Sequence, residues 1–231
     1  MSELVFHSLR VIEVASLTDD AVAVTFDVPS ELGDAFNYLP GQHVTLRAFI
    51  DGEDVRRSYS ICSNANASKL RVGIKRLAGG AFSTYATSRL KSGDTLDVMA
   101  PVGEFTIEPD PVGSAHRVAI VAGSGITPVL SLMSTTLESE SASVWTLLYG
   151  NKTANSVMFL EELEGLKDRY SDRVQLFHLL SREGSDLPFL SGRIDAEKIT
   201  TVYRHLVQGE RVAGWYLCGP YEMVMMAQET L

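Results

Sequence analysis

The segment VRRSYSICSN, residues 55–64, has the length of a β-strand but carries an unusual set of polar side chains. Alternate side chains of a strand point to opposite faces of the sheet. Arg57 and Tyr59 therefore share one face of this strand, while Ser58 and Ser60 share the other. Two adjacent arginines and a tyrosine in a half-buried strand indicate that it contributes to a binding site as well as to a core.

The same segment lies in a basic stretch of an otherwise acidic chain. The chain has 231 residues and a net charge of −9, yet residues 55–93 contain no aspartate or glutamate. Two alternatives are open: a solvated basic face, or an anion site, since phosphates prefer fixed cations and exposed N–H groups. The acidic total argues against nonspecific nucleic-acid binding. The cations of the stretch are Arg56, Arg57, Lys69, Arg71, Lys75, Arg76, Arg89 and Lys91.

Composition excludes several classes of protein. A hydrophobic fraction of 45% is typical of a soluble globular protein, and no apolar run approaches the ~20 residues that span a bilayer. The first residues lack the features of a secretory signal. The two cysteines, Cys62 and Cys218, are too few for a four-thiolate cluster or a disulfide framework, and the histidines lack metal-ligand spacing. We expect a cytoplasmic protein without a metal.

The pattern of apolar residues changes near residue 112. Before it, short β-branched runs separated by turn signals predict an antiparallel barrel, with one helix over 81–93. After the linker EPDPVGSAH, buried strands alternate with amphipathic helices, which predicts a parallel sheet covered on both faces. We expect domains at residues 1–112 and 113–231. In the second domain the predicted strands are 117–123, 144–150, 173–181 and 214–219, and the predicted helices are 125–138, 155–170, 195–206 and 221–231.

A glycine-rich turn, AGSGITP, follows the first strand of the second domain and opens a helix. Gly123 and Gly125 permit close approach of a diphosphate to the helix N-terminus. The motif departs from G-x-G-x-x-G because Pro128 occupies the third glycine position, and Asn151 stands where an acid is usual. A plain dinucleotide-dependent dehydrogenase is therefore disfavoured, and an ordinary α/β turn stays an alternative.

Four motifs occur in order along the chain: RSYS (57–60), GGAFS (79–83), GSGITP (123–128) and CGP (218–220). Together they make the sequence resemble the ferredoxin–NADP⁺ reductase superfamily over essentially its whole length. LLSRE (179–183) and SGRID (191–195) make it most similar to the reductase components of multicomponent oxygenases, such as the phenylacetyl-CoA epoxidase system of phenylacetate catabolism. The resemblance implies a Greek-key flavin-binding barrel followed by a nucleotide-binding α/β domain.

For the barrel, the resemblance implies a bound FAD. Arg57 would pair with the flavin diphosphate, Tyr59 would lie against the isoalloxazine, and Ser60 would hydrogen-bond the hydride-accepting N5, with Ser58 beside it. The main chain of a later strand and the start of a helix would contribute further contacts. Alternatively, Tyr59 is an ordinary barrel tyrosine and the glycine pair an ordinary turn. Those further contacts are assigned to Val72, Gly73, Ile74, Lys75, Gly79, Gly80, Ala81, Phe82 and Ser83.

For the second domain, the resemblance implies a nicotinamide dinucleotide. Thr127 would sit between flavin and nicotinamide, and Cys218, followed by Gly219 and Pro220, would lie beside nicotinamide C4. A buried structural cysteine is the competing interpretation. Ser181 and Arg182 match the contacts of a 2′-phosphate, which favours NADPH and leaves NADH possible.

The expected activity is hydride transfer from NADPH to FAD, with single electrons then passing to a [2Fe–2S] acceptor that serves an oxygenase or epoxidase. That acceptor is expected to be a separate ferredoxin or a C-terminal ferredoxin domain missing from this chain, which ends at AQETL. The alternative is a regulatory or electron-transfer subunit that binds flavin without turnover.

Overall fold

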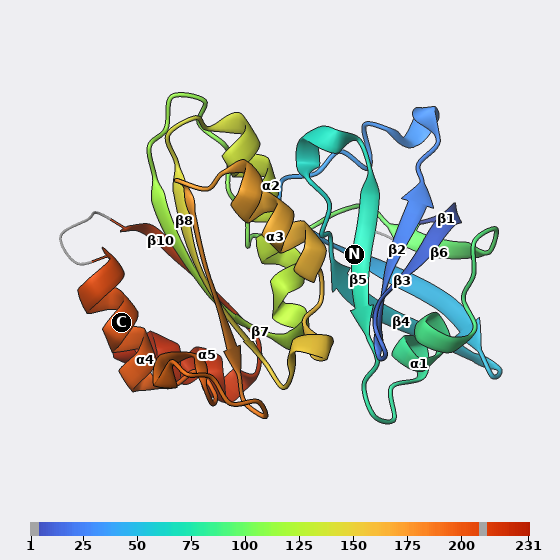
Figure 1. The fold of residues 1–231 in the computed structure, drawn as a ribbon. Helices are drawn as coiled ribbons and strands as arrows, with labels where there is room; N and C mark the ends of the chain where they lie inside the picture. The colour runs from blue at the N-terminus through green and yellow to red at the C-terminus, as the bar shows by residue number, and fades with distance from the viewer. Residues whose placement is uncertain (1–4, 208–211) are drawn as a thin grey trace. The chain divides into compact units, whose positions relative to one another are not determined.

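A computed structural model describes residues 5–207 and 212–231 (Figure 1). Its contacts divide the chain into two compact units. The first comprises residues up to 108 together with 130–135, and the second comprises 109–129 together with the residues from 136 onward.

The first unit is a curled antiparallel sheet with strand order β4-β3-β6-β1-β2-β5. Its edge strands meet at an isolated antiparallel bridge between Ile61 and Val72, which brings the end of β4 beside the middle of β5. The predicted antiparallel barrel is thus confirmed as a curled sheet. Its elements are β1 (Phe6–Thr18), β2 (Ala21–Asp27), β3 (His43–Ile50), β4 (Glu53–Ser60), β5 (Leu70–Lys75), α1 (Ala81–Ser88) and β6 (Thr95–Met99).

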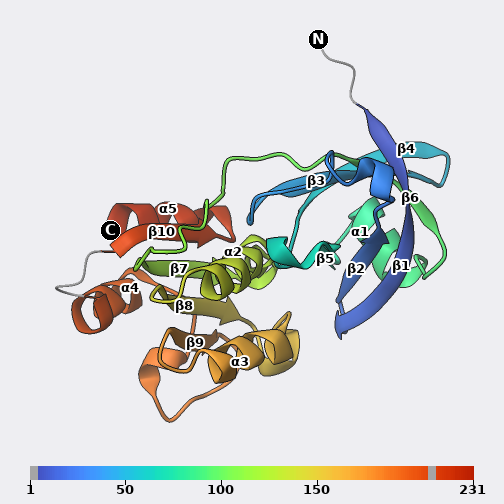
Figure 2. The ribbon, with the colours of Figure 1, turned by 90° about the horizontal axis from the view of Figure 1, so that it is seen from above.

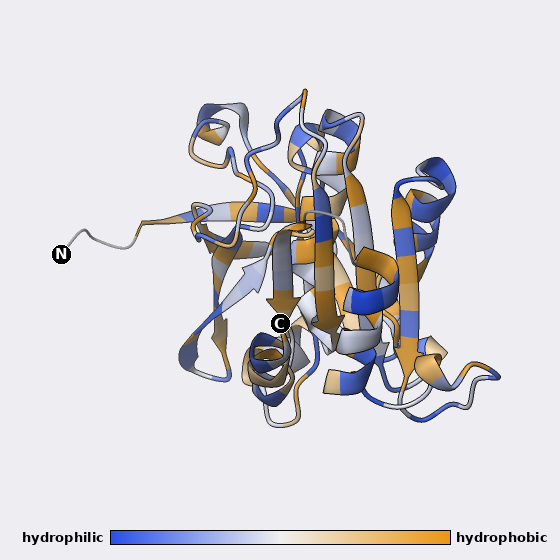
Figure 3. Cartoon of the chain, turned by 90° about the vertical axis from the view of Figure 1, so that its left-hand side faces the viewer, coloured by the Kyte–Doolittle hydropathy of each residue, from blue (hydrophilic) through white to orange (hydrophobic). Residues whose placement is uncertain are grey.

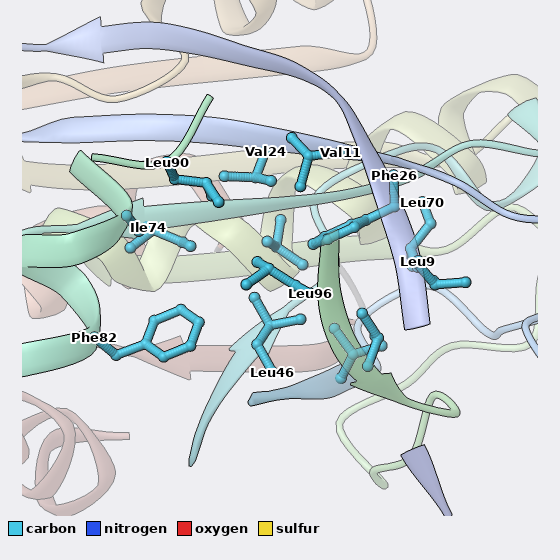
Figure 4. Packing of buried hydrophobic residues seen from close by; sticks show 14 of the residues in the cluster. Leu9, Val11, Val24, Phe26, Leu46, Leu70, Ile74, Phe82, Leu90 and Leu96 are labelled. Carbon is cyan, nitrogen blue, oxygen red and sulfur yellow. The ribbon is translucent and has the colours of Figure 1, made fainter. Parts of the chain in front are cut away.

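The core of the first unit is apolar and lies inside the curl of the sheet (Figure 4). Leu9 and Val11 of β1 face it from alternate positions, as the strand period requires. Phe82 is 1% exposed and seats α1 against this core. Burial of these side chains stabilises the curl, because each fully buried large aliphatic or aromatic side chain contributes about 1.5–3 kcal/mol.

Helix α1 is shorter than predicted. The sequence pattern placed its end near Gly93, but the helix ends at Ser88, and Arg89 leaves helical geometry with φ −124°. Gly93 has φ +95° and lies in a turn held by the Lys91 N–H, which donates to Asp94 Oδ2 at 3.0 Å. The prediction was wrong because the apolar spacing of Tyr85 and Leu90 continues past the last helical turn.

The second unit is a parallel sheet with strand order β10-β7-β8-β9. Helices α2 and α3 lie on one face of this sheet and α4 and α5 on the other, as Figures 1 and 2 show. Figure 3 shows the strands of this sheet as mainly hydrophobic, consistent with burial on both faces. Its elements are β7 (His116–Ala122), α2 (Ile126–Ser139), β8 (Val144–Asn151), α3 (Leu160–Arg169), β9 (Val174–Leu180), α4 (Ala196–Val202), β10 (Val212–Cys218) and α5 (Tyr221–Thr230).

Helix α3 begins five residues later than predicted. Residues 157–159 are buried instead in an irregular segment, and Phe159 has φ +59°, a left-handed conformation that is rare for a bulky side chain. A short 3-10 turn, Ala154–Ser156, precedes this segment and is capped by reciprocal hydrogen bonds of Thr153 and Ser156. The apolar periodicity of VMFL therefore reflects burial of a connection rather than the first turn of a helix. Helix α4 ends at Val202, and a π-helical turn, Tyr203–Val207, continues it over the remainder of the predicted span.

Candidate functional site

Strand β4 presents the RSYS motif at the edge of the barrel sheet. Arg57 and Ser58 are exposed, while Tyr59 and Ser60 are half-buried. The antiparallel register with β3 places Arg57 opposite Leu46 and Tyr59 opposite Val44. The structure therefore brings the four motif side chains onto one accessible edge strand above a buried core.

The two adjacent arginines of this strand differ in their partners. Arg56 forms an ion pair with Asp54, with Nη2 and Oδ2 2.7 Å apart. Arg57 Nη1 donates only to the Arg56 carbonyl oxygen, at 2.6 Å, and within the described residues no carboxylate lies in ion-pair range of it. Arg57 is therefore the cation on β4 that remains available to an anion, whereas Arg56 is already paired with a carboxylate.

Other cations of the basic stretch are also engaged. Lys75 pairs with Asp20 at 3.1 Å and Arg89 pairs with Asp51 at 3.1 Å, in each case with a carboxylate from outside residues 55–93. Part of the concentration of charge that the sequence shows is therefore neutralised by contacts with neighbouring strands and turns. Lys75 belongs to the VGIK segment of β5, so its side chain is turned to Asp20 while its backbone pairs with β2.

Tyr59 connects the β4 motif to the start of helix α1. Its ring centroid lies 5.6 Å from that of Phe82, the second residue of α1, with the planes tilted by 41°. Burial raises the pKa of Tyr59 to about 12, against a lowering effect of the Arg57 charge, so the phenol stays neutral and can donate a hydrogen bond. RSYS and GGAFS thus meet through an aromatic contact.

The GGAFS segment forms the turn into α1. Gly79 has φ +72°, which explains the glycine at that position. A Cβ on Gly80 would lie 2.6 Å from Ser83 Oγ, so the second glycine is required by close packing. Ser83 is 4% exposed; its Oγ accepts from the Leu77 N–H and donates to the Gly80 carbonyl oxygen. The hydroxyl that the sequence suggested as a phosphate donor is thus occupied within the turn.

In the second unit, the GSGITP and CGP motifs are packed together at the carboxyl edge of the sheet. A Cβ on Gly125 would lie 2.1 Å from the Cys218 carbonyl oxygen, and one on Gly219 would lie 3.1 Å from the Ala122 nitrogen. Strands β7 and β10 are adjacent, with Cys218 opposite Val121. Ligands of open α/β sheets bind at this edge, and the glycines allow two motifs that are distant in the sequence to pack together there.

The predicted site residues around this packed turn, Thr127, Pro128 and Cys218, are buried or half-buried. Thr127 and Pro128 are buried at the start of α2, and Thr127 Oγ1 donates to the Ser124 carbonyl oxygen at 2.9 Å. Cys218 is half-buried and free, and burial raises the pKa of its thiol. The Cys218 thiol is therefore neutral at pH 7, which fits a positioning role and not a nucleophilic one.

The ends of β8 and β9 form a second cluster at the same edge. The Ser181 N–H donates to the Asn151 carbonyl oxygen at 3.0 Å, and the Arg182 N–H to that of Lys152 at 2.8 Å. Lys152, Ser181 and Arg182 are all exposed. Asn151 is 9% exposed, and its Nδ2 has no hydrogen-bond partner among the residues that the structure describes. An exposed pair of cations beside a hydroxyl could bind a phosphate-bearing nucleotide.

One residue of this site was not predicted. Tyr149 is fully buried in β8, and its hydroxyl donates to the carbonyl oxygen of Gly123 at 3.0 Å. The available signal was a tyrosine in the apolar run VWTLLYG, since a buried tyrosine usually has a hydrogen-bond partner.

Within residues 5–207 and 212–231, no group of three or more histidine, cysteine or acidic side chains could hold a metal ion. Among the helices of these residues, none has both the length and the apolar character needed to cross a membrane.

Comparisons with known proteins match both units. The oxidoreductase FAD-binding domain family matches residues 8–107, and the oxidoreductase NAD-binding domain family matches residues 119–229. The chain is 44% identical over 226 residues to a subunit of the 1,2-phenylacetyl-CoA epoxidase from Escherichia coli K12, covering 98% of this chain and 64% of that protein. It is 32% identical over 200 residues to ferredoxin–NADP reductase B of Sorangium cellulosum, covering 85% of this chain and 80% of that protein.

A third relative is the ferredoxin reductase component of the 3-ketosteroid-9-alpha-monooxygenase of Rhodococcus rhodochrous. The chain is 37% identical to it over 175 residues, which cover 74% of this chain and 48% of that component. The chain thus spans less than two thirds of the epoxidase protein and of this component. Among solved structures, the ferredoxin NADP⁺ reductase of Neisseria gonorrhoeae with bound FAD and NADP aligns at a TM-score of 0.79 and 20% identity, covering 99% of this chain and 91% of that one. The ferredoxin–NADP⁺ reductase of Plasmodium falciparum with 2′P-AMP aligns at a TM-score of 0.79 and 20% sequence identity. This alignment covers 97% of this chain and 91% of that one. At this identity the two structures establish the fold.

Proposed function

Because the chain belongs to the ferredoxin–NADP⁺ reductase-like family of FAD- and NAD-binding oxidoreductases, we propose that it transfers hydride from NADPH to FAD and then single electrons to a [2Fe–2S] acceptor. In this proposal residues 1–112 bind FAD and residues 113–231 bind the dinucleotide. The observation that carries it is the exposed guanidinium of Arg57 on the motif strand, which has no carboxylate partner among the described residues, whereas the adjacent Arg56 is paired with Asp54.

FAD, when bound, supplies the group that accepts a hydride and can release electrons one at a time. Arg57 is proposed to bind its diphosphate, since a planar guanidinium matches two phosphate oxygens. Tyr59 offers a flat, neutral ring face, and Ser60 offers a hydroxyl at the end of the same strand. The turn at Gly79 and Gly80 allows a diphosphate to approach the first N–H groups of α1 without meeting a side chain.

In the second unit, Cys218 and Thr127 are proposed to position the nicotinamide and to exclude water from it. The Cys218 thiol is neutral and half-buried at the strand end, so it presents a small polarisable surface. NADPH is favoured over NADH because Lys152 and Arg182 have no carboxylate in ion-pair range among the described residues, and Ser181 adds a hydroxyl beside them. A 2′-phosphate supplies the charge that such a cluster requires.

The acceptor and the final oxidation are proposed from the named relatives. One belongs to an epoxidase, and another is the ferredoxin reductase component of a monooxygenase. We therefore propose that the electrons reach an oxygenase or epoxidase through a [2Fe–2S] ferredoxin, either a separate protein or a linked domain, in the cytoplasm.

Anaerobic reduction of the purified protein tests the proposal. The protein should show flavin absorbance, and the addition of NADPH should bleach it faster than the same concentration of NADH. Absorbance without bleaching by either donor would instead support a flavin-binding subunit without turnover. A protein that shows no flavin absorbance after reconstitution with FAD would contradict both.

Two cysteine variants make this experiment more specific. We expect Cys218→Ala to slow flavin reduction at saturating NADPH at least tenfold with unchanged FAD content, as expected for lost alignment of donor and acceptor. Cys62→Ala is the matched control, because Cys62 is buried in the first unit and its thiol donates to the Arg71 carbonyl oxygen. Equal reduction rates in wild type and Cys218→Ala, measured by stopped flow, would remove Cys218 from the site.

A further inference from the structure

We propose that Tyr149 is a positioning residue of the dinucleotide site, whose buried hydroxyl holds the Gly123 carbonyl and so fixes the N–H groups of the turn between β7 and α2. The proposal rests on the function proposed above and adds a residue that lies outside the four sequence motifs. It concerns the affinity for the dinucleotide and not the hydride transfer itself.

Tyr149 reaches the turn from the neighbouring strand. It is opposite Val121 in the register of β7 and β8, and Gly123 lies two residues beyond Val121. The side chain is 0% exposed, and its ring centroid lies 5.9 Å from the ring of His178 on β9. The hydroxyl donates to the Gly123 carbonyl oxygen at 3.0 Å, and the Met158 carbonyl oxygen lies at 3.5 Å. Burial raises the pKa of Tyr149, so the hydroxyl keeps its proton and remains a donor.

The Tyr149 hydroxyl adds a side-chain restraint to Gly123. This residue begins a short 3-10 turn, and its carbonyl oxygen also accepts from the Ile126 N–H. Its φ is +55°, and a Cβ built on it would meet nothing within 4 Å, so no packing restrains the residue on that side. Glycine has the largest conformational freedom of any residue, so a second donor to its carbonyl oxygen limits the conformations that Gly123 samples.

Two consecutive carbonyls of the turn are held by side-chain hydroxyls. Tyr149 binds that of Gly123, and Thr127 Oγ1 binds that of Ser124. A trans peptide is planar, so its carbonyl and the N–H of the next residue point in opposite directions. Holding the two carbonyls therefore fixes the N–H groups of Ser124 and Gly125, which are the donors expected to face a diphosphate.

Tyr149→Phe tests the proposal because it deletes one oxygen and leaves the buried ring. In the FAD-loaded chain, the dissociation constant of NADP⁺, measured by titration calorimetry, should rise about threefold to tenfold, the range expected for one lost hydrogen bond. The KM for NADPH should rise by the same factor, while the rate of flavin reduction at saturating NADPH changes less than twofold. An unchanged dissociation constant with a lowered melting temperature would show that Tyr149 is only structural, and would overturn the proposal.

Thr146→Val is the matched control on the same strand. Thr146 is fully buried, and its Oγ1 is 2.9 Å from His116 Nε2 and 3.4 Å from Gln175 Oε1, so this variant also removes a buried, hydrogen-bonded hydroxyl from β8. It should lower the melting temperature but leave the affinity for NADP⁺ unchanged, and an equal loss of affinity in both variants would refute a specific role of Tyr149. If the wild-type protein binds neither NADP⁺ nor NAD⁺, the proposed function itself fails, and the role of Tyr149 fails with it.

Discussion

The two units hold their candidate binding residues in different ways. In the first unit the RSYS residues lie along β4, where Arg57 and Ser58 are exposed at the edge of a sheet with an apolar core. In the second unit the candidate residues come from the ends of separate strands and are held by close backbone approach and by buried polar groups. The ion pairs of the barrel, such as Arg47–Asp97, are partly exposed, whereas the pair Arg117–Glu140 of the second unit is buried.

This contrast separates the effects of substitution in the two units. Changes in the exposed motif side chains of the barrel, such as Arg57, should weaken ligand binding without unfolding the unit, because these side chains lie outside the core. Changes in the second unit should affect folding and binding together. Both tryptophans, Trp145 and Trp215, lie in the second unit, so tryptophan fluorescence reports on its unfolding while flavin absorbance reports on the first.

The largest effect is expected for Glu140→Gln. Glu140 is 0% exposed and accepts from Arg117, from the Ser143 hydroxyl and from the Asp110 N–H. Losing its charge leaves Arg117 buried without a counter-ion, and breaking a buried pair costs about 3–5 kcal/mol. Urea unfolding followed by tryptophan fluorescence should show this loss. Asp97→Asn is the control for a partly exposed pair, and it should lower the stability of the first unit by at most about 1 kcal/mol. Equal losses of stability in the two variants would contradict the difference between the buried and the exposed ion pair.

The same carboxyl group predicts a pH dependence. Burial alone raises the pKa of Glu140, but hydrogen bonds from Arg117, Ser143 and the Asp110 backbone, together with the Arg117 charge, outweigh it and lower the pKa below its ordinary value of 4.5. A carboxyl whose folded-state pKa is lowered stabilises the fold above its unfolded pKa, and this stabilisation is lost as pH falls through the folded value. The difference in the free energy of unfolding between wild type and Glu140→Gln should therefore be constant above about pH 5 and shrink at lower pH. A difference that stays the same down to about pH 3 would show that the Glu140 carboxylate is not its cause.

The second largest effect is expected for Arg57→Gln in the first unit. Losing a charge-assisted hydrogen bond costs about 1.5–3 kcal/mol, so the dissociation constant of FAD should rise roughly 10- to 100-fold. The neighbouring Arg56→Gln is the control, because Arg56 is already paired with Asp54 and should leave FAD binding within about twofold. Flavin fluorescence on titration measures both, and the apo-protein of each variant should unfold like wild type. If Arg56→Gln proved the more damaging, the assignment of the anion site would be wrong.

Gly125→Ala follows, since it places a Cβ 2.1 Å from the Cys218 carbonyl oxygen and forces the two motifs apart. Overpacking of this kind costs about 1–3 kcal/mol, and here the loss should appear both in urea unfolding of the second unit and in the affinity for NADP⁺. Gly165→Ala is the control: a Cβ on this residue of α3 meets nothing within 4 Å, so the change should stabilise the helix by about 0.4–1 kcal/mol. Retention of full NADP⁺ affinity by Gly125→Ala would show that the motifs do not depend on this contact.

The two units also differ in how much the sequence revealed. The RSYS strand and the alternation of strands and helices follow from local patterns, so the fold class was predicted and confirmed. The contact of Gly125 with Cys218 joins residues 93 positions apart (218 minus 125), and only the order of parallel strands brings them together. Tyr149 was missed for the same reason, because its partner lies in the turn that follows the adjacent strand β7. The early end of α1 and the late start of α3 depend on φ angles of single residues, which apolar periodicity does not encode.

The smallest effect, Ser83→Ala, decides between two roles of one hydroxyl. In the structure Ser83 Oγ accepts from the Leu77 N–H at 3.1 Å and donates to the Gly80 carbonyl oxygen at 3.3 Å. A hydroxyl used within the turn stabilises the first unit whether or not FAD is bound, so Ser83→Ala should cost about 0.5–1.5 kcal/mol equally in the apo- and FAD-loaded protein. The dissociation constant of FAD would then change less than twofold. If the hydroxyl binds the diphosphate directly, the apo-protein would be unaffected and FAD would bind about tenfold more weakly, because hydrogen bonds to charged groups are the stronger class. Thermal unfolding of the apo- and FAD-loaded protein separates these two outcomes. An equal loss of stability in both would assign phosphate binding at this turn to the backbone alone.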